Sequence, residues 1–220
     1  MATTDGKPQG NANGLDLEFV IKSFEEAHPE KDKVIMDHYL VGYAEITRFF
    51  EVMGSLFGFV VKDMKEKMGI LHKHKESNYK ENFQTIQSMI AYELEEKLTD
   101  VKSPDGLPSG SRTLLRLHRS LEFIAELLRS IKESESDAKV SSLASTVYSE
   151  TLAKHHPWLI RKAAGLAMYT LPSRKQFMET SFKLPAEEAE KVLPDFLKVT
   201  KSIYDEIQEL YAKHNLLNLP

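Results

Sequence analysis

Apolar residues recur at steps of three and four along most of the chain, and this spacing decides the fold class. The clearest run consists of Tyr79, Phe83, Ile86, Ile90, Leu94 and Leu98. Such spacing places all members of a run on one face of a helix. No stretch of the 220 residues alternates β-branched and polar side chains as a half-buried strand does. Gly and Pro, which interrupt helices, number only 10 and 9. The pattern predicts an all-α protein.

Spacing, capping residues and breakers together predict nine helical stretches with short joints, which correspond to about eight helices that are mostly apolar on one face. They are expected over residues 15–27, 33–54, 56–73, 78–99, 112–131, 138–155, 158–170, 173–182 and 186–214. Asp137 and Ser173 are expected to cap two of them, and Pro157 to begin another. Pro194 is expected to kink or split the last helix. Because helices with one apolar face bury it by packing in layers, we expect a two-layer helical sandwich.

Composition and charge narrow the class of protein. Residues 1–14 contain no apolar core of a secretory signal and are expected to form a flexible tail, which leaves residues 15–220 as a single domain. The net charge of −4 argues against general nucleic-acid binding. The chain has no Cys, which excludes disulfides and thiolate metal sites and fits a reducing compartment. The apolar runs fall short of the roughly 20 residues of a membrane span, so we expect a cytosolic protein.

Three arginines share one face of the helix predicted over residues 112–131. Arg112, Arg116 and Arg119 are separated by four and then three residues, which places them on the same side. Burying like charges together without an anion would be costly. The spacing alone leaves two interpretations open. The arginines form either an exposed basic stripe or a cluster that binds a phosphate or carboxylate through forked hydrogen bonds.

Asp63 and Lys67 also allow two interpretations. Asp63 follows a very apolar turn, and Lys67 lies four residues further along the same predicted helix. The pair forms either a surface salt bridge worth under about 1 kcal/mol or the polar mouth of an apolar chamber. In the second case the carboxylate accepts hydrogen bonds from a ligand, and the ammonium pairs with the ligand's charge.

The histidines do not suggest a metal site. Neither His155 and His156 nor His72 and His74 share a helix face, so a two-histidine metal site is not expected, and no cofactor is predicted. His156 is either a structural imidazole or a donor to a ligand carbonyl. Trp158, the only tryptophan, is either a core residue or an anchor at a membrane interface.

Five motifs, taken in order, resemble the glycolipid transfer protein superfamily. They are F-x-x-K-D-M-x-x-K at Phe59–Lys67, S-R-T-L-L-R-L-H-R at Ser111–Arg119, H-P-W-L-I-R-K-A at His156–Ala163, T-L-P-S-R at Thr170–Arg174 and Y-A-K-H-N-L-L-N-L-P at Tyr211–Pro220. Each motif alone is weak, whereas their order and spacing are highly specific. The resemblance extends from about Leu15 to Pro220 and implies a two-layer helical sandwich that encloses a lipid.

The resemblance also implies roles for single residues. Asp63 matches the aspartate that accepts hydrogen bonds from the sphingoid amide and hydroxyl, and His156 matches the donor to the acyl-amide carbonyl. The cations that match the phosphate-binding residues are Lys67, Arg112 and Arg116, with Lys102 as a further match in a loop of different length. Trp158 matches a residue that meets the membrane, where the nearby Arg161 and Lys162 would favour anionic lipids.

Two departures from the sugar-binding branch indicate a phosphate headgroup. Arg116 stands where that branch has a tryptophan that stacks on the sugar, and Lys67 stands where it has an asparagine. The implied function is intermembrane transfer of a phosphosphingolipid such as ceramide 1-phosphate, through transient contact with membranes. The sequence does not identify protein partners.

Other functions remain as alternatives to lipid transfer. The chain could be a glycosphingolipid carrier, or a sensor that binds sphingolipid without transferring it. A helical scaffold that binds only proteins would not need the charged set. An enzyme would use Asp63 and His156 as an acid–base pair, but the sequence contains no nucleophile elbow, metal-ligand set or nucleotide-binding loop.

Overall fold

The computed structural model describes residues 10–220, and over that range nine α-helices and three short 3₁₀ helices form the regular structure. In chain order they are α1 (Leu17–Ala27), α2 (Met36–Val52), η1 (Ser55–Phe57), α3 (Gly58–Glu76), η2 (Lys80–Phe83), α4 (Ile86–Glu95), α5 (Gly110–Glu133), α6 (Val140–Glu150), η3 (Ala153–His155), α7 (Trp158–Tyr169), α8 (Arg174–Thr180) and α9 (Ala186–Lys213). The expected all-α fold is confirmed.

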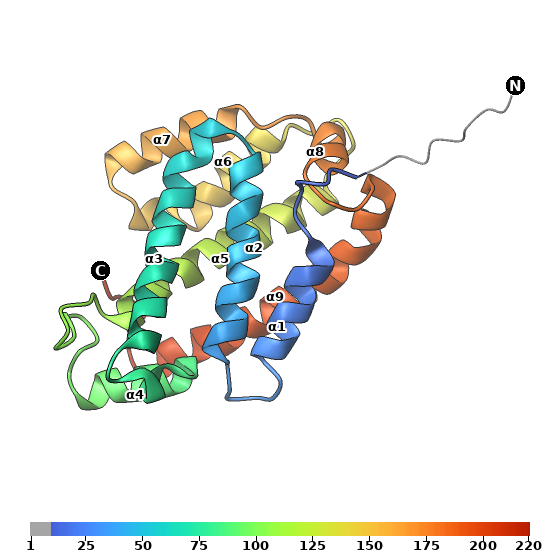
Figure 1. Cartoon of the computed structure of the whole chain (residues 1–220). Helices are drawn as coiled ribbons and strands as arrows, with labels where there is room; N and C mark the ends of the chain where they lie inside the picture. Colours follow the sequence, from blue (N-terminus) through green and yellow to red (C-terminus); the bar gives the residue numbers. More distant parts are fainter. Residues whose placement is uncertain (1–9) are drawn as a thin grey trace, which may run out of the picture.

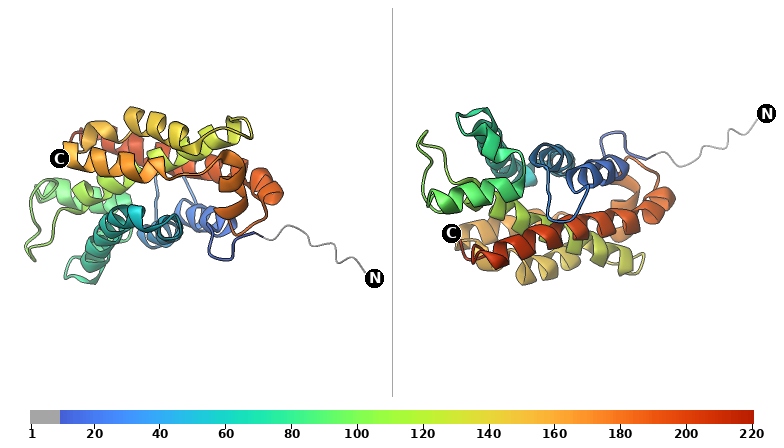
Figure 2. Two further views of the ribbon diagram at one scale, coloured as in Figure 1. Left: turned by 90° about the horizontal axis from the view of Figure 1, so that it is seen from above. Right: turned by 90° about the horizontal axis from the view of Figure 1, so that it is seen from below.

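The helices pack in two layers (Figures 1 and 2). Helices α1, α2 and α3 lie side by side in one layer, drawn in blue to green, and α5, α6 and α9 form the other. The layers meet where α1 packs on α9 and where α3 packs on α5. Helix α7 packs on α6 and on η1, at the end where α3 begins. This arrangement surrounds a space between α3, α5, α6 and α7, where the site lies.

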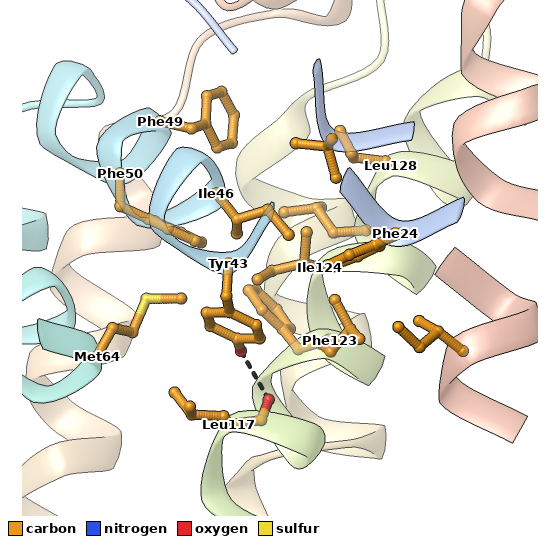
Figure 3. Close-up of a cluster of buried hydrophobic side chains, with 14 of the residues drawn as sticks. Phe24, Tyr43, Ile46, Phe49, Phe50, Met64, Leu117, Phe123, Ile124 and Leu128 are labelled. Atoms are coloured by element: carbon orange, nitrogen blue, oxygen red, sulfur yellow. Dashed lines mark hydrogen bonds between the residues drawn. The ribbon is translucent and has the colours of Figure 1, made fainter. Parts of the chain in front are cut away.

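Large apolar side chains from both layers fill the interior (Figure 3). Ile46 and Phe50 of α2 face Ile124 of α5 across the interface between the layers. Tyr43 is also fully buried, and its hydroxyl donates a 2.6 Å hydrogen bond to the carbonyl of Leu117. Burying each such side chain is worth about 1.5–3 kcal/mol. The amphipathic faces of α2 and α5 therefore hold the two layers together.

Two local predictions were wrong. Residues 78–99 do not form one helix, because η2 ends at Phe83 and Thr85 begins α4 with a capping box in which its side chain accepts from the Ser88 N–H. Asp137 does not cap α6. The residue before α6 is Lys139, which makes no side-chain cap. The backbone there pairs instead with residues 172–174, as in the 3.2 Å bond from the Val140 N–H to the Pro172 carbonyl.

Other boundary predictions are confirmed in part. The Ser173 side chain accepts from the Gln176 N–H at the start of α8. Pro157 directly precedes the first residue of α7 as its N-cap. Pro194 lies inside α9, which runs unbroken from Ala186 to Lys213, so this proline does not split the helix. Losing one backbone hydrogen bond is tolerated because the apolar face of α9 is buried along its length.

The predicted tail over residues 1–14 falls largely on residues outside the described range. Its last part is hydrogen-bonded to the domain. The Asn11 N–H donates to the Phe182 carbonyl over 2.9 Å, and the Arg48 guanidinium donates to the carbonyls of Asn13 and Gly14, each over 2.6 Å. Residues 11–14 therefore pack along the segment that joins α8 to α9.

Candidate functional site

A pocket of about 490 Å³ lies between α3, α5, α6 and α7. Its apolar wall consists of Phe50, Phe57, Phe59, Val60, Met64, Phe123, Ile124, Leu152, Ile160, Ala164, Ala167 and Met168. Met64 of α3 and Phe123 of α5, both labelled in Figure 3, contribute to this wall from the two layers. The charged residues of the wall are Lys62, Asp63, Glu66, Lys67, Arg116 and Arg119, all from α3 and α5. The pocket is thus an apolar space with a charged border.

Asp63 and Lys67 form an ion pair one helical turn apart on α3. The Asp63 side chain is 60% exposed, whereas that of Lys67 is 10% exposed. An ammonium group carries three N–H donors, and within residues 10–220 Asp63 is the hydrogen-bond partner of the Lys67 ammonium. Lys67 is therefore a nearly buried cation with donors to spare, at the border of an apolar pocket.

The arginines of α5 diverge, although they share a helix face. Arg116 is exposed and lines the pocket, and its guanidinium has no hydrogen-bond or ion-pair partner in the described part of the chain. Arg112 does not line the pocket; its guanidinium lies 3.3 Å from the Asp100 carboxylate. Lys102 is exposed on the loop before α5 and is likewise not part of the pocket wall. The structure brings Asp63, Lys67, Arg116 and His156 together and leaves Arg112 and Lys102 outside.

Arg119 is a pocket residue to which the resemblance assigned no role. Its guanidinium donates to the carbonyls of Leu217 and Leu219, over 2.8 and 3.1 Å, and so holds the segment that follows α9 against the pocket. Burial, and then the charge of Arg116, lower the pKa of Arg119. The three-arginine stripe was the sequence signal for Arg119. Its partners could not be predicted because they lie about a hundred residues away in the chain.

His156 lies between η3 and α7 and lines the pocket opposite α3. Its Nδ1 atom is 2.8 Å from the Tyr148 hydroxyl of α6. Burial lowers the pKa of His156, an effect opposed by the Asp63 charge and reinforced by Lys67. The imidazole is therefore neutral near pH 7. The neighbouring His155 also lines the pocket, and burial together with the charges of Arg119 and Lys154 lowers its pKa to about 4.

A second polar cluster fixes the N-terminus of α5. Glu93 of α4 is 1% exposed. Its carboxylate accepts hydrogen bonds from the Ser109 hydroxyl (2.9 Å), the Gly110 N–H (2.6 Å) and the Ser111 N–H (2.9 Å). A negative charge is favourable there because the first N–H groups of a helix have no partner inside it. Sequence reasoning missed Glu93, although its position three residues after Ile90 on the apolar face of α4 was a signal.

The loop before α5 is held close to α3 and α4 by two further features. His74 of α3 is stacked on Phe83, with ring centroids 4.4 Å apart, and its Nε2 donates to the Pro108 carbonyl over 2.8 Å. A Cβ at Gly110 would lie 2.7 Å from Met89 Sδ and 2.8 Å from Phe83 Cε1, so a larger residue here would force these side chains to move. The start of α5, and with it the register of its arginines, is fixed relative to α3.

Helix α7 exposes a strip of large apolar side chains. Trp158 is 63% exposed and is therefore not a core residue. Leu159, Leu166 and Tyr169 on the same helix are more exposed still. The Lys162 ammonium lies 5.8 Å from the Trp158 ring, within range of a cation–π contact. Exposed apolar strips of this kind mark surfaces that meet a partner or a membrane.

These observations define a class of protein, an all-helical carrier with an apolar chamber and a charged border. The sequence model described as "Glycolipid transfer protein (GLTP)" matches residues 34–183. The chain therefore belongs to the glycolipid transfer protein family.

Several relatives of this chain carry the name ceramide-1-phosphate transfer protein. The chain is 38% identical over 209 residues to the ceramide-1-phosphate transfer protein of Mus musculus, a match that covers 94% of this chain and 97% of that protein. The lipid-free crystal structure of the mouse protein has a TM-score of 0.86, with 94% of this chain and 100% of that one covered. The human ceramide-1-phosphate transfer protein, solved with 2:0 ceramide 1-phosphate, is 36% identical, with the same TM-score and coverage.

Proposed function

We propose that this protein transfers a phosphosphingolipid, ceramide 1-phosphate foremost, between membranes. The observation that carries the proposal is the border of the pocket, where the nearly buried Lys67 stands beside Asp63 above an apolar wall, together with Arg116, whose guanidinium has no partner among residues 10–220. A lipid with an anionic headgroup and two apolar chains matches both parts of the site. Similarity to proteins named for ceramide 1-phosphate transfer supports the same substrate.

Each polar residue has a distinct role in this proposal. Asp63 accepts hydrogen bonds from the amide and hydroxyl of the sphingoid base, and His156 donates to the acyl-amide carbonyl. Lys67 and Arg116 bind the phosphate, and the attraction of these cations outweighs the repulsion between the phosphate and the Asp63 carboxylate. Arg112 joins them by exchanging its ion pair with Asp100 for the phosphate. Lys102 lies on the loop before α5, two residues after Asp100. It can reach the same phosphate only if this loop moves toward the pocket.

The apolar wall supplies the free energy that makes extraction of a lipid feasible. Exposing one methylene to water costs about 0.8 kcal/mol. A two-chain lipid has on the order of thirty methylenes, so bare extraction would cost about 24 kcal/mol by the same coefficient. A carrier must therefore offer an apolar space of its own, which the phenylalanine-rich wall between α3, α5 and α7 begins to provide.

The exposed strip of α7 is the proposed membrane-docking surface. Trp158, Leu159, Leu166 and Tyr169 would enter the lipid interface, and Arg161 and Lys162 would add about 1 kcal/mol each on anionic membranes. Between residues 10 and 220 no helix is both long and apolar enough to span a bilayer. In this proposal the carrier is cytosolic and visits membranes transiently through α7, which also forms one wall of the pocket.

The decisive experiment measures transfer of fluorescent ceramide 1-phosphate and fluorescent galactosylceramide between vesicles. The wild type is expected to move the phosphate lipid alone, and Arg116→Leu is expected to lose that transfer. Arg129→Leu, on the same helix but outside the pocket, is the matched control. Transfer of galactosylceramide would instead identify a glycosphingolipid carrier. Binding without transfer would identify a lipid sensor, and neither binding nor transfer would indicate a scaffold.

A second variant tests the role of the carboxylate. Asp63→Val should abolish transfer of ceramide 1-phosphate while the helix content stays unchanged, because the Asp63 side chain is 60% exposed. Circular dichroism and the vesicle assay together separate loss of function from loss of fold. Transfer at the wild-type rate in this variant would contradict the assignment of Asp63.

A further inference from the structure

The contact between Tyr148 and His156 is the feature of the pocket that the roles above leave unexplained. The Tyr148 hydroxyl lies 2.8 Å from Nδ1 of His156, and both residues line the pocket. The Tyr148 ring is nearly buried and packs edge-on against Phe123, with centroids 6.2 Å apart and an angle of 89° between the rings. The hydroxyl is thus held in place by packing that does not depend on the hydrogen bond.

One hydrogen atom lies between the two atoms, and it belongs either to the phenol or to Nδ1. If Nδ1 carried it, the phenolic hydrogen would need another acceptor. Within residues 10–220, His156 is the hydrogen-bond partner of that hydroxyl. The charge of Arg161 also acts on this hydroxyl, but a guanidinium has donors only and cannot accept the phenolic hydrogen. A buried hydroxyl without an acceptor is costly, so the phenol donates and Nδ1 accepts.

Both rings have the protonation that this direction requires. Burial raises the pKa of Tyr148, so the phenol keeps its hydrogen at neutral pH. Burial also lowers the pKa of His156, so the imidazole carries a single hydrogen. Because Nδ1 is occupied as an acceptor, that single hydrogen is on Nε2.

We propose that Tyr148 is a positioning residue that holds His156 in the Nε2–H tautomer, so that the pocket presents a fixed donor at this point. The group that such a donor recognises is an acceptor without a hydrogen of its own, such as an amide carbonyl. Tyr148 would in this way make the pocket selective for N-acylated sphingolipids over those that lack the carbonyl. This selectivity rests on the proposed function, whereas the tautomer itself does not.

The first test is nitrogen NMR of the lipid-free protein labelled with ¹⁵N-histidine. In the wild type, His156 is expected to show a protonated Nε2 and an unprotonated Nδ1. In Tyr148→Phe, which keeps the packing against Phe123 but removes the hydroxyl, a substantial Nδ1–H population is expected. A protonated Nδ1 in the wild type would overturn the proposal whatever the variant does. An unchanged tautomer in a folded Tyr148→Phe would overturn it as well.

The second test measures the consequence for lipid choice. Transfer of ceramide 1-phosphate is compared with transfer of an N-alkyl analogue in which a methylene replaces the carbonyl. Tyr148→Phe should reduce the preference of the wild type for the amide by about fivefold, as expected for one neutral hydrogen bond. Tyr79→Phe, at a partly exposed tyrosine outside the pocket, should leave it unchanged. An unchanged preference in Tyr148→Phe would overturn the proposed selectivity. If the tautomer is as expected but neither lipid is carried, the proposed function fails and the positioning of His156 stands.

Discussion

Two polar clusters lie beside α5, and they differ in how far their hydrogen-bonding capacity is used. At the start of the helix, the buried Glu93 carboxylate accepts three hydrogen bonds from Ser109, Gly110 and Ser111. At the pocket border, Lys67 has one partner, and Arg116 has none among the described residues. In the first cluster both oxygens of the Glu93 carboxylate accept hydrogen bonds from the protein itself, and in this sense we call it saturated; the Ser111 hydroxyl beside it has no partner among residues 10–220. The second has donors to spare beside an apolar space.

The difference teaches how to separate structural polar groups from binding ones. A saturated buried cluster has nothing left to offer a ligand, and disturbing it costs stability because its members cannot turn to water. An unsaturated cluster at a pocket border contributes little to stability, and its free donors are available to an anion. Residue type and burial alone would not have made this distinction, since Lys67 is almost as buried as Glu93.

The largest expected effect is on stability and comes from the saturated cluster. Glu93→Ala leaves the Gly110 and Ser111 N–H groups buried without an acceptor, which should cost about 4 kcal/mol at about 1–3 kcal/mol per group. Urea unfolding followed by circular dichroism measures this loss. Glu95→Ala, on the exposed side of the same helix, is the matched control and should change stability little. If Glu93→Ala lowered the stability as little as Glu95→Ala does, the cluster would not be structural.

A second buried polar group adds a dependence of stability on pH. Burial lowers the pKa of His118 to about 4, despite a 2.8 Å hydrogen bond to Gln208. Between about pH 6.5 and 4, His118 binds a proton in the unfolded chain but stays neutral in the folded protein. The stabilisation is therefore complete above pH 6.5 and is lost as the pH falls toward 4, by about 3 kcal/mol in total. Urea unfolding at several pH values measures the slope.

The control for this slope removes the titrating group. His118→Phe keeps a ring against Tyr204, whose centroid lies 4.2 Å from that of His118, but it cannot bind a proton. Its stability should fall less steeply between pH 6.5 and 4 than that of the wild type. Equal slopes in the two proteins would mean that other groups cause the dependence.

In the unsaturated cluster, the expected effect moves from stability to function. Lys67→Met removes a charge-assisted bond to the phosphate, worth about 2 kcal/mol, so transfer of ceramide 1-phosphate should fall about thirtyfold. Stability should stay the same or rise, since an apolar side chain replaces a nearly buried cation. Lys65→Met, at an exposed lysine of the same helix outside the pocket, is the matched control. A marked loss of stability without loss of transfer would make Lys67 a structural residue.

The smallest expected effect concerns the exposed apolar strip of α7, which the described part of the protein also leaves uncovered. Trp158→Ala should weaken binding to anionic vesicles about tenfold, corresponding to about 1.5 kcal/mol of lost apolar burial. The unfolding midpoint should not change, because the side chain is 63% exposed in the protein. Vesicle co-sedimentation measures the binding, with Phe19→Ala, an exposed aromatic of α1, as control. Unchanged binding with a lowered midpoint would place Trp158 in a structural role.

The sequence predicted the helices better than it predicted their ends. Spacing of apolar residues identified the long helices, because that spacing follows from the geometry of a single helix. It joined residues 78–99 into one helix because it counted apolar positions and not the capping box at Thr85. It assigned the cap of α6 to Asp137, whereas the backbone there pairs with residues 172–174. That pairing depends on where α7 and α8 return in space.

For the candidate site, the sequence by itself determined which residue types were available and which shared a helix face. Motif order identified Asp63, Lys67, Arg116 and His156, and the structure brings them to one pocket. Only the tertiary structure decided that Arg112 turns to Asp100, that Arg119 holds residues 217–219, and that Glu93 is saturated. The physical reason is the separation along the chain between the residues that interact. Helix periodicity is local, whereas a charged side chain's partner depends on which distant segment packs against its helix.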